Sequence, residues 1–315
     1  MTRGGKTFLS GQGALWLTAF IWGTTFVAQS LGAEHLGYFT VNGVRSLLGA
    51  LTILLCVRLL NGRRGGTPSR EEYKTLIKGG VLCGILLFGA ANAQQAAISQ
   101  VDADGELANV GKVSFLTAVY LVLVPVLGVF LGRRTGWLTW LSVLVAIAGA
   151  YLLTVRGGMD GFSASDALAL GCALLFSVQI LVVDHFAPNV DCLRLSMLQF
   201  VTCGVLSMIC ALMFEKPTFG ALWEAKGPVL YAGLLSSGLA YTLQMVGQKN
   251  CPPQIASLIM SLESVFGALS AYLVLGQGLS FTELTGCALM FGAVLLAVFN
   301  PSLARSNREN ESQAS

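Results

Sequence analysis

Glu263 is the one carboxylate that stands in the middle of a long apolar stretch of this chain. In low-dielectric surroundings a carboxyl group favours its neutral form, and it can exchange a proton when its surroundings change. Such a group could carry the proton of a coupled transport step. It could equally be a protonated helix anchor, hydrogen-bonded near Ser261 or Ser264. Both interpretations stay open for this candidate coupling residue.

Amide and hydroxyl side chains form two stripes at helical spacing in two other apolar stretches. Gln95 and Gln244 hold corresponding places in them, and Asn92 and Tyr241 join these glutamines as candidate substrate-binding residues. Because amides both donate and accept hydrogen bonds, the stripes could hold a zwitterion. They could instead join helices, at roughly 0.6–2 kcal/mol per pair. The full stripes are Asn92, Gln95 and Ser99, and Ser237, Tyr241, Gln244 and Gln248.

Four further side chains are candidates for a cavity. Asn109, Lys112 and Tyr120 lie close to one face of a single apolar stretch. The ammonium of Lys112 could attract a substrate carboxylate in an outer vestibule, or it could simply reach the membrane interface along its flexible stem. Trp22 lies too deep in its stretch to be an interfacial belt residue, so it either stacks on a substrate or packs in the core.

Arg45 and Gln199 fall at matching places in the two halves of the chain. Arg45 lies deep enough in its apolar stretch to require partners. We favour a structural polar network, in which Arg45 contacts backbone carbonyls or Gln199, over contact with a substrate.

Several classes of site have no support in the sequence. The chain has no C-x-x-C, its histidines are His35 and His185, and no G-x-x-x-x-G-K-[ST] motif occurs, so neither a zinc site nor a nucleotide site is predicted. We expect no cofactor and no catalytic residue, because paired carboxylates, a histidine cluster and a nucleophile motif are also missing. The net charge of +3 is too small and too scattered to indicate a nucleic-acid partner.

The composition is that of a membrane protein. Of 315 residues, 54% are hydrophobic and 11% are charged, against about 25% charged residues in a typical soluble domain. The mean hydropathy is +0.71. Many of the 37 glycines lie inside apolar stretches, which is typical of membrane helices. These values exclude a disordered chain and an ordinary cytosolic enzyme.

Ten stretches are long enough to cross a bilayer, which requires about 20 apolar residues each. They are predicted at 14–33, 38–60, 76–97, 107–132 and 136–155, and at 165–185, 193–214, 228–248, 254–276 and 281–299. The first is read as an uncleaved helix and not a signal peptide. The predicted organisation is a segment 1–13, a first repeat 14–155, a second repeat 165–299 and a polar tail 300–315.

The basic residues set the expected orientation. With the N-terminus in the cytoplasm, only Arg156, Lys216 and Lys226 among the loop lysines and arginines face outward. Both termini are therefore predicted to be cytoplasmic. Small residues four apart near helix ends, such as Gly132 and Gly136, are compatible with a homodimer but do not decide it.

The two halves of the chain resemble each other. Leu82–Gln95 matches Tyr231–Gln244 at five identical positions, and Ala148–Val155 matches Phe291–Val298 at five of eight. Each half holds five crossings, an odd number, so the halves must lie in opposite orientations in the bilayer. Inverted repeats with a central site near the midplane are a recurrent plan of secondary transporters.

These motifs resemble the drug/metabolite transporter superfamily, and in particular its ten-span EamA-like family, over nearly the whole chain. The resemblance is carried by Trp22-Gly23-Thr24-Thr25-Phe26, by Lys112-Val113-Ser114-Phe115-Leu116-Thr117 with Tyr120 and Val124-Pro125-Val126, and by Ser261-Leu262-Glu263-Ser264-Val265 with Leu275-Gly276-Gln277. The family commonly has Glu-Pro in its ninth span and Glu after the closing Gly; Ser264 and Gln277 depart from that pattern.

The resemblance implies an all-α integral membrane protein of ten helices in two inverted repeats, placed in the bacterial plasma membrane. Similar family members export amino acids and related metabolites, or drugs. We therefore expect a small-molecule exporter that works by alternating access, with amino acids as the expected substrates. The alternative is a proton-coupled exporter of organic cations with Glu263 as its essential acid. A channel is disfavoured because no crossing carries a ring of charge.

Overall fold

The computed structural model describes residues 3–61, 69–100, 110–133, 135–154, 163–249, 251–275 and 280–298. Every regular element in these ranges is a helix. Nine crossings in these ranges are long and apolar enough to span a membrane by length and composition, and the apolar helix Trp137–Leu152 is shorter. The predicted all-helical membrane fold is confirmed. The predicted tail 300–315 lies outside the described residues.

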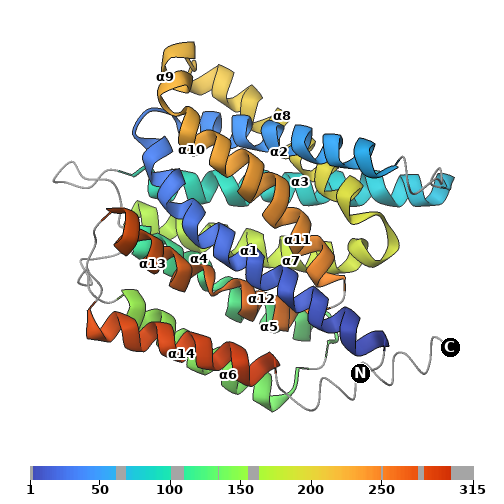
Figure 1. Ribbon diagram of the computed structural model, residues 1–315, viewed down its shortest axis with the longest axis vertical. Coiled ribbons are helices and arrows are strands. Elements are labelled where there is room, and N and C mark those ends of the chain that lie inside the picture. Colours follow the sequence, from blue (N-terminus) through green and yellow to red (C-terminus); the bar gives the residue numbers. More distant parts are fainter. Residues whose placement is uncertain are drawn as a thin grey trace.

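The helices follow the predicted crossings closely (Figure 1). The first half contains α1 (Arg3–Ala33), α2 (Tyr38–Asn61), α3 (Arg70–Ile98), α4 (Val110–Ala118) with α5 (Tyr120–Phe130), and α6 (Trp137–Thr154). The second half contains α7 (Ala164–Phe186), η2 (Ala187–Asn189), α8 (Cys192–Phe214), α9 (Phe219–Glu224), α10 (Lys226–Tyr231), η3 (Ala232–Ala240), α11 (Tyr241–Gln248), α12 (Pro253–Met260), α13 (Glu263–Leu275) and α14 (Phe281–Val298).

Helix contacts repeat across the two halves. α3 packs on α7 and α8, and its counterpart, the crossing formed by α10, η3 and α11, packs in the same way on α1 and α2. α1 contacts α12 and α13, as α7 contacts α4 and α5. The other extensive contacts pair α2 with α8, and α6 with α14, which lie together at one edge of the bundle in Figure 1. The corresponding helices of the two halves therefore make corresponding contacts.

Two crossings are interrupted near their middle, one in each half. The regular α-helical hydrogen bonding of the fourth crossing is interrupted at Val119, between α4 and α5, and that of the ninth at 261–262, between α12 and α13, where three-residue hydrogen bonds replace it. These interruptions are called breaks below. The Ser261 hydroxyl donates to the carbonyl of Leu258 at 2.8 Å, a local bond that competes with a regular helix. Irregular backbone at membrane depth is tolerated where it is buried in protein or lines a cavity. The two breaks therefore indicate the position of a central site.

The eighth crossing is also irregular, because η3 is a π-helix. Its wider turns lie directly against α2. A Cβ built on Gly49 of α2 would come within 2.6 Å of the Ser237 Cβ, so only glycine permits this approach. π-helical segments are rare and frequently occur at functional sites.

Polar contacts join the helices at opposite ends of the bundle. At the end of α8, the Glu215 carboxylate accepts hydrogen bonds from the backbone N–H groups of Phe39 and Thr40, at 2.8 and 2.7 Å, and so caps α2. At the other end, Arg133 after α5 forms an ion pair with Asp184 of α7.

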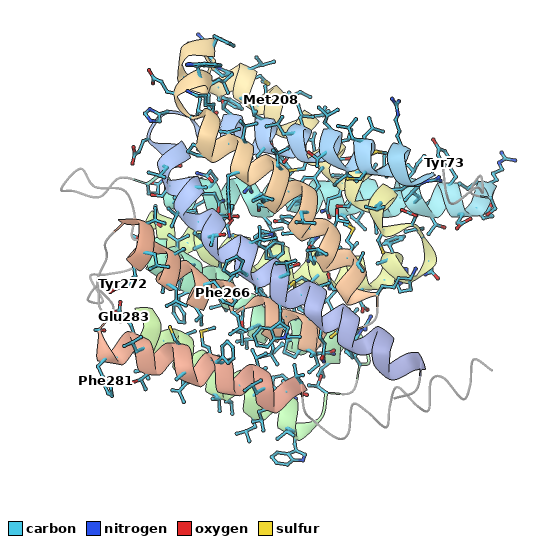
Figure 2. All side chains as sticks on the ribbon, in the orientation of Figure 1. Tyr73, Met208, Phe266, Tyr272, Phe281 and Glu283 are labelled. Atoms are coloured by element: carbon cyan, nitrogen blue, oxygen red, sulfur yellow. The ribbon has the colours of Figure 1, made fainter. Side chains whose placement is uncertain are left out.

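Gly23 brings α1 against the broken ninth crossing. A Cβ at this position would lie 2.5 Å from the Phe266 Cβ and 2.7 Å from the carbonyl oxygen of Glu263. Figure 2 shows Phe266 on α13 beside α1, and its ring makes an edge contact with Phe20 at a centroid distance of 5.4 Å. Gly23 therefore sets the depth at which Glu263 meets α1.

We expect Gly23→Ala to lower the apparent melting temperature in detergent, because overpacking of a filled interface costs about 1–3 kcal/mol. Gly13→Ala is the matched control on the same helix, since a Cβ there meets nothing within 4 Å. Thermal denaturation of both purified variants measures the difference. Equal melting temperatures for the two variants would contradict the close packing of α1 on α13.

Candidate functional site

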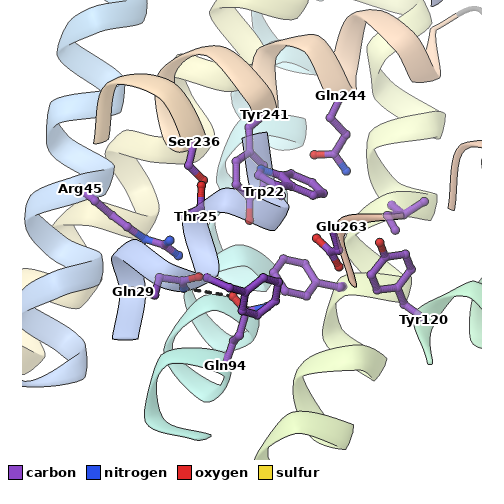
Figure 3. A pocket seen from close by; sticks show the side chains of 13 residues that line it. Trp22, Thr25, Gln29, Arg45, Gln94, Tyr120, Ser236, Tyr241, Gln244 and Glu263 are labelled. Atoms are coloured by element: carbon purple, nitrogen blue, oxygen red, sulfur yellow. Dashed lines mark hydrogen bonds between the residues drawn. The ribbon is translucent and has the colours of Figure 1, made fainter. Parts of the chain in front are cut away.

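A cavity lies at the centre of the bundle, between the two broken crossings (Figure 3). The space between its walls is about 430 Å³ when its open side is included, and about 30 Å³ of it admits the centres of water molecules. Side chains from both halves of the chain line it. They are Trp22, Thr25, Phe26, Gln29, Arg45, Gln94, Tyr120, Phe176, Ile180, Ser236, Tyr241, Gln244 and Glu263.

Tyr120 and Glu263 are the first residues of α5 and α13, directly after the two breaks. The breaks thus hold both side chains at the cavity, where Figure 3 shows them near each other. Glu263 is 4% exposed, and its Oε1 atom has no hydrogen-bond partner among the described residues. The Tyr120 hydroxyl interacts with this carboxyl group, although the two do not form a hydrogen bond of regular geometry. Because Glu263 is the first residue of α13, the partial positive charge at the helix N-terminus stabilises a negative charge on its carboxyl group.

Arg45 reaches the cavity from α2, on the other side of Trp22 and Tyr241 from Glu263 (Figure 3). Its residue is 4% exposed. Within the part of the chain that the structure describes, its guanidinium makes no hydrogen bond and no ion pair. The cavity therefore contains a cation at one side and a carboxyl group at the other.

Two hydrogen-bonded sets of glutamines each contribute to the cavity lining. Gln29 donates from Nε2 to the Oε1 of Gln94 at 3.2 Å, on the Arg45 side. Gln244 donates to Gln179 at 3.4 Å, and Gln179 donates to Gln199 at 3.0 Å. The Gln244 Oε1 has no partner among the described residues, so it remains available to a donor in the cavity.

Aromatic rings form the wall between the two charged groups. The Trp22 and Tyr241 ring centroids lie 4.6 Å apart with an interplanar angle of 56°. Phe200 supports Tyr241 from behind in an edge contact at 5.1 Å. The Trp22 Nε1 is buried without a hydrogen-bond acceptor among the described residues. This wall offers a flat apolar surface with unused polar groups at its edges.

The structure brings six of the residues singled out from the sequence to the cavity, namely Trp22, Arg45, Tyr120, Tyr241, Gln244 and Glu263. It places other candidates elsewhere. Asn92 donates to Ser207 at 2.9 Å and accepts from Asn42 at 3.2 Å, between helices.

Gln95 is fully buried and donates to the backbone carbonyl of Gln29 at 3.1 Å, outside the cavity lining. Gln199 accepts from Gln179, and no bond joins it to Arg45 among the described residues. Asn109 lies outside the described residues, and only the backbone of Lys112 is described.

Seven lining residues were not anticipated: Thr25, Phe26, Gln29, Gln94, Phe176, Ile180 and Ser236. A usable signal existed for some of them. Gln29 follows Trp22 by seven residues, which places both on one face of a helix. Phe176 stands as far beyond Trp22 in the chain as Gln199 stands beyond Arg45, so the repeat itself pointed to it.

The chemistry of the lining suits reversible binding of a polar small molecule. One cation, one carboxyl group and amides can hold both charges of a zwitterion, and the aromatic wall can hold an apolar body. Among the described residues, no group of three His, Cys, Asp or Glu side chains could hold a metal ion.

Comparison with known proteins gives one family for both halves of the chain. The EamA-like transporter family matches residues 9–155 and 163–299. A solved crystal structure of a protein superposes with a TM-score of 0.74 at 20% identity, covering 94% of this chain and 98% of the other. That likeness shows the fold.

Curated relatives match over most of their lengths. An uncharacterized transporter of Archaeoglobus fulgidus is 26% identical, covering 89% of this chain and 83% of the relative. The uncharacterized inner membrane transporter YedA of Escherichia coli is 24% identical, covering 92% and 91%. A probable terminal-alkyne amino-acid exporter of Streptantibioticus cattleyicolor is 27% identical, covering 90% and 91%.

The two corresponding glutamines should respond differently to substitution. We expect Gln244→Leu to impair transport while the melting temperature changes little, because Gln244 faces the cavity and its hydrogen bond to Gln179 is long. Gln95→Leu should lower the melting temperature and leave substrate affinity nearly unchanged, because its amide joins α3 to α1. Thermal denaturation and transport kinetics on the same preparations test this. A Gln95→Leu protein with normal stability and weakened substrate affinity would reverse the assignment.

Proposed function

The chain belongs to the EamA-like transporter family, and from this premise we propose that it is a secondary transporter that exports small metabolites, with amino acids as its substrates. That the chain is a multi-pass membrane transporter follows from the family and the apolar helices. The substrate class is the proposal. One observation carries it: a single cavity contains the carboxyl group of Glu263 and the guanidinium of Arg45, which has no partner among the described residues.

An amino acid matches this lining in charge. Its carboxylate and ammonium groups need one cation and one anion or several amides, all of which are present. A relative named as a probable amino-acid exporter, 27% identical to this chain, supports the same substrate class. We also propose that the chain catalyses no reaction, in keeping with relatives that are named as transporters.

Alternating access is the proposed mechanism. We assign the two repeats to 14–155 and 165–299, with 1–13 and 300–315 on the cytoplasmic side of the plasma membrane. Each repeat contributes one broken crossing to the cavity, so a movement at Val119 and at 261–262 would change both walls at once. Interrupted helices around a midplane site are the recurrent arrangement in transporters built from inverted repeats.

Export of organic cations is the second candidate. The stacked Trp22 and Tyr241 rings could bind a cation over their faces, and Glu263 could neutralise it. Arg45 opposes this candidate, because a cation in the same low-dielectric cavity would repel the substrate. The amino-acid assignment therefore takes precedence.

Counterflow in proteoliposomes tests the substrate class. Purified protein is reconstituted with a high internal concentration of one unlabelled compound, and entry of its labelled form is measured for neutral, acidic and basic amino acids, nucleosides and organic cations. We expect transient accumulation of neutral amino acids. Accumulation of organic cations with none of amino acids would reject the proposal in favour of the second candidate.

A separate experiment tests whether Glu263 carries a coupling proton. The titratable or charged groups near it are Tyr120, Tyr241 and Cys172, with Arg45 across the cavity. Glu263→Gln imitates the protonated state permanently. We expect it to retain exchange at equal pH and to lose accumulation driven by a pH gradient in inverted vesicles.

Glu34→Gln, at an exposed position between α1 and α2, is the matched control and should behave as the wild type. Accumulation by Glu263→Gln at the wild-type rate under a pH gradient would exclude the proton-carrier role. In that case a hydrogen-bonded structural carboxyl group would explain the burial of Glu263.

A further inference from the structure

Arg45 is a buried cation, and no described residue forms a hydrogen bond or an ion pair with its guanidinium. A guanidinium at membrane depth costs several kcal/mol unless it is paired or solvated. Its residue is 4% exposed, it lines the cavity, and no hydrogen bond or ion pair to a described residue satisfies it. A group with five N–H donors in a rigid fork is thus presented to the cavity.

Among the described residues, no carboxylate lies next to the Arg45 guanidinium. The titratable groups that interact electrostatically with it are Tyr241, Cys203 and Cys172, none of which is a carboxyl group. Gln29 and Gln94, on the same side of the cavity, bond to each other. Figure 3 shows the one carboxyl group of the lining, Glu263, beyond Trp22 and Tyr241. An anion for Arg45 therefore has to enter with the substrate.

We propose that Arg45 binds the carboxylate of the substrate and is the residue by which the cavity selects carboxylate-bearing molecules. This inference rests on the proposed function and specifies one end of its site. The planar carboxylate matches the guanidinium fork with two parallel hydrogen bonds. From that end, the body of the substrate extends along the rings of Trp22 and Tyr241.

Charge balance selects a carboxylate over a phosphate. Among the described side chains, Arg45 is the only lysine or arginine that lines the cavity, so it neutralises one negative charge. A phosphate ester brings up to two charges at neutral pH, and the second would meet Glu263 and a low-dielectric wall. A carboxylate is neutralised completely.

The lining also defines the preferred body of the substrate. Phe26, Phe176 and Ile180 complete the apolar wall beside Trp22 and Tyr241. No second cation stands ready for an acidic side chain among these lining residues. The site therefore favours carboxylates with an apolar or aromatic body over glutamate-like or aspartate-like ones.

Competition in counterflow tests the role of Arg45. Labelled phenylalanine is the reporter, and the competitors are phenylalanine, phenylalaninamide, phenethylamine and 3-phenylpropionate. These compounds share the ring and differ in the carboxylate or the amine. For the wild type we expect the amide and the amine, which lack a carboxylate, to compete about tenfold to a hundredfold more weakly than phenylalanine, as expected for loss of charge-assisted hydrogen bonds. Equal competition by acid and amide would overturn the proposal.

Variants connect that discrimination to one residue. Arg45→Gln should raise the KM for phenylalanine about tenfold or more and bring the acid-to-amide ratio close to one. Arg45→Lys keeps the charge but loses the planar guanidinium, so its KM and its acid-to-amide ratio should lie between those of the wild type and of Arg45→Gln. Arg58→Gln, at the exposed cytoplasmic end of the same helix, should match the wild type. A folded Arg45→Gln protein that keeps the wild-type ratio would also overturn the proposal.

A thermal-shift measurement of ligand binding to the wild-type protein tests the proposal even if the Arg45→Gln variant does not fold or phenylalanine is not transported. On the wild-type protein, 3-phenylpropionate should raise the melting temperature more than phenethylamine does, whereas the reverse order would reject the role of Arg45. Transport of a carboxylate without an amine, and of no amino acid, would reject the proposed substrate class while leaving the role of Arg45 intact. The two failures are therefore distinguishable.

Discussion

The absence of water inside a bilayer is the constraint on which this structure depends. Each polar group at membrane depth must find its partner in the protein or in a molecule that enters it. Most comply: Asn92 joins α3 to α8 through Ser207, and Gln95 joins α3 to α1 through a backbone carbonyl. Some exceptions lie around one cavity, where Arg45 and the Oε1 of Glu263 lack partners among the described residues. Others, such as Gln12 and Gln248, lie outside its lining. A cation and a carboxyl group without partners thus line the same cavity, as a site for a charged substrate requires.

Architecture explains why the exceptions can persist there. In a continuous helix the backbone N–H and C=O groups bond to each other. Where a helix is interrupted, the irregular turn sets the direction of the side chains that follow it. The breaks at Val119 and at 261–262 occur in corresponding crossings, and each is followed at once by a cavity residue, Tyr120 or Glu263. The approach of Gly23 to the backbone of Glu263 closes the bundle around the second break. Small residues and broken helices thus work together to place a carboxyl group where lipid cannot reach it.

Much of the fold could be predicted because hydropathy reports crossings directly: α2 and α8 begin within a residue of the predicted positions. α3 begins at Arg70, earlier than predicted, because Ser69 and a polar first turn extend the helix beyond the apolar stretch. Glu263 and Gln244 were identifiable because polar residues are costly in mid-span. Phe176 was missed because an apolar side chain looks the same whether it faces lipid or a cavity. Gln94 was missed because hydropathy does not separate it from its neighbour Gln95, although one residue turns a helix by about 100°.

The scaffold is symmetric, but its chemistry is not. Arg45 and Gln199 hold corresponding places, yet Arg45 lines the cavity and Gln199 bonds to Gln179. Tyr120 and Glu263 stand as far apart in the chain as the matched segments of the fifth and tenth crossings, yet one is a phenol and the other an acid. Symmetric packing brings the two states of an inverted-repeat carrier close in energy, because each half can adopt the arrangement of the other. Unequal side chains on that frame give the cavity a cationic and an acidic side. A dipolar substrate would then bind in one orientation while the helices around it exchange roles.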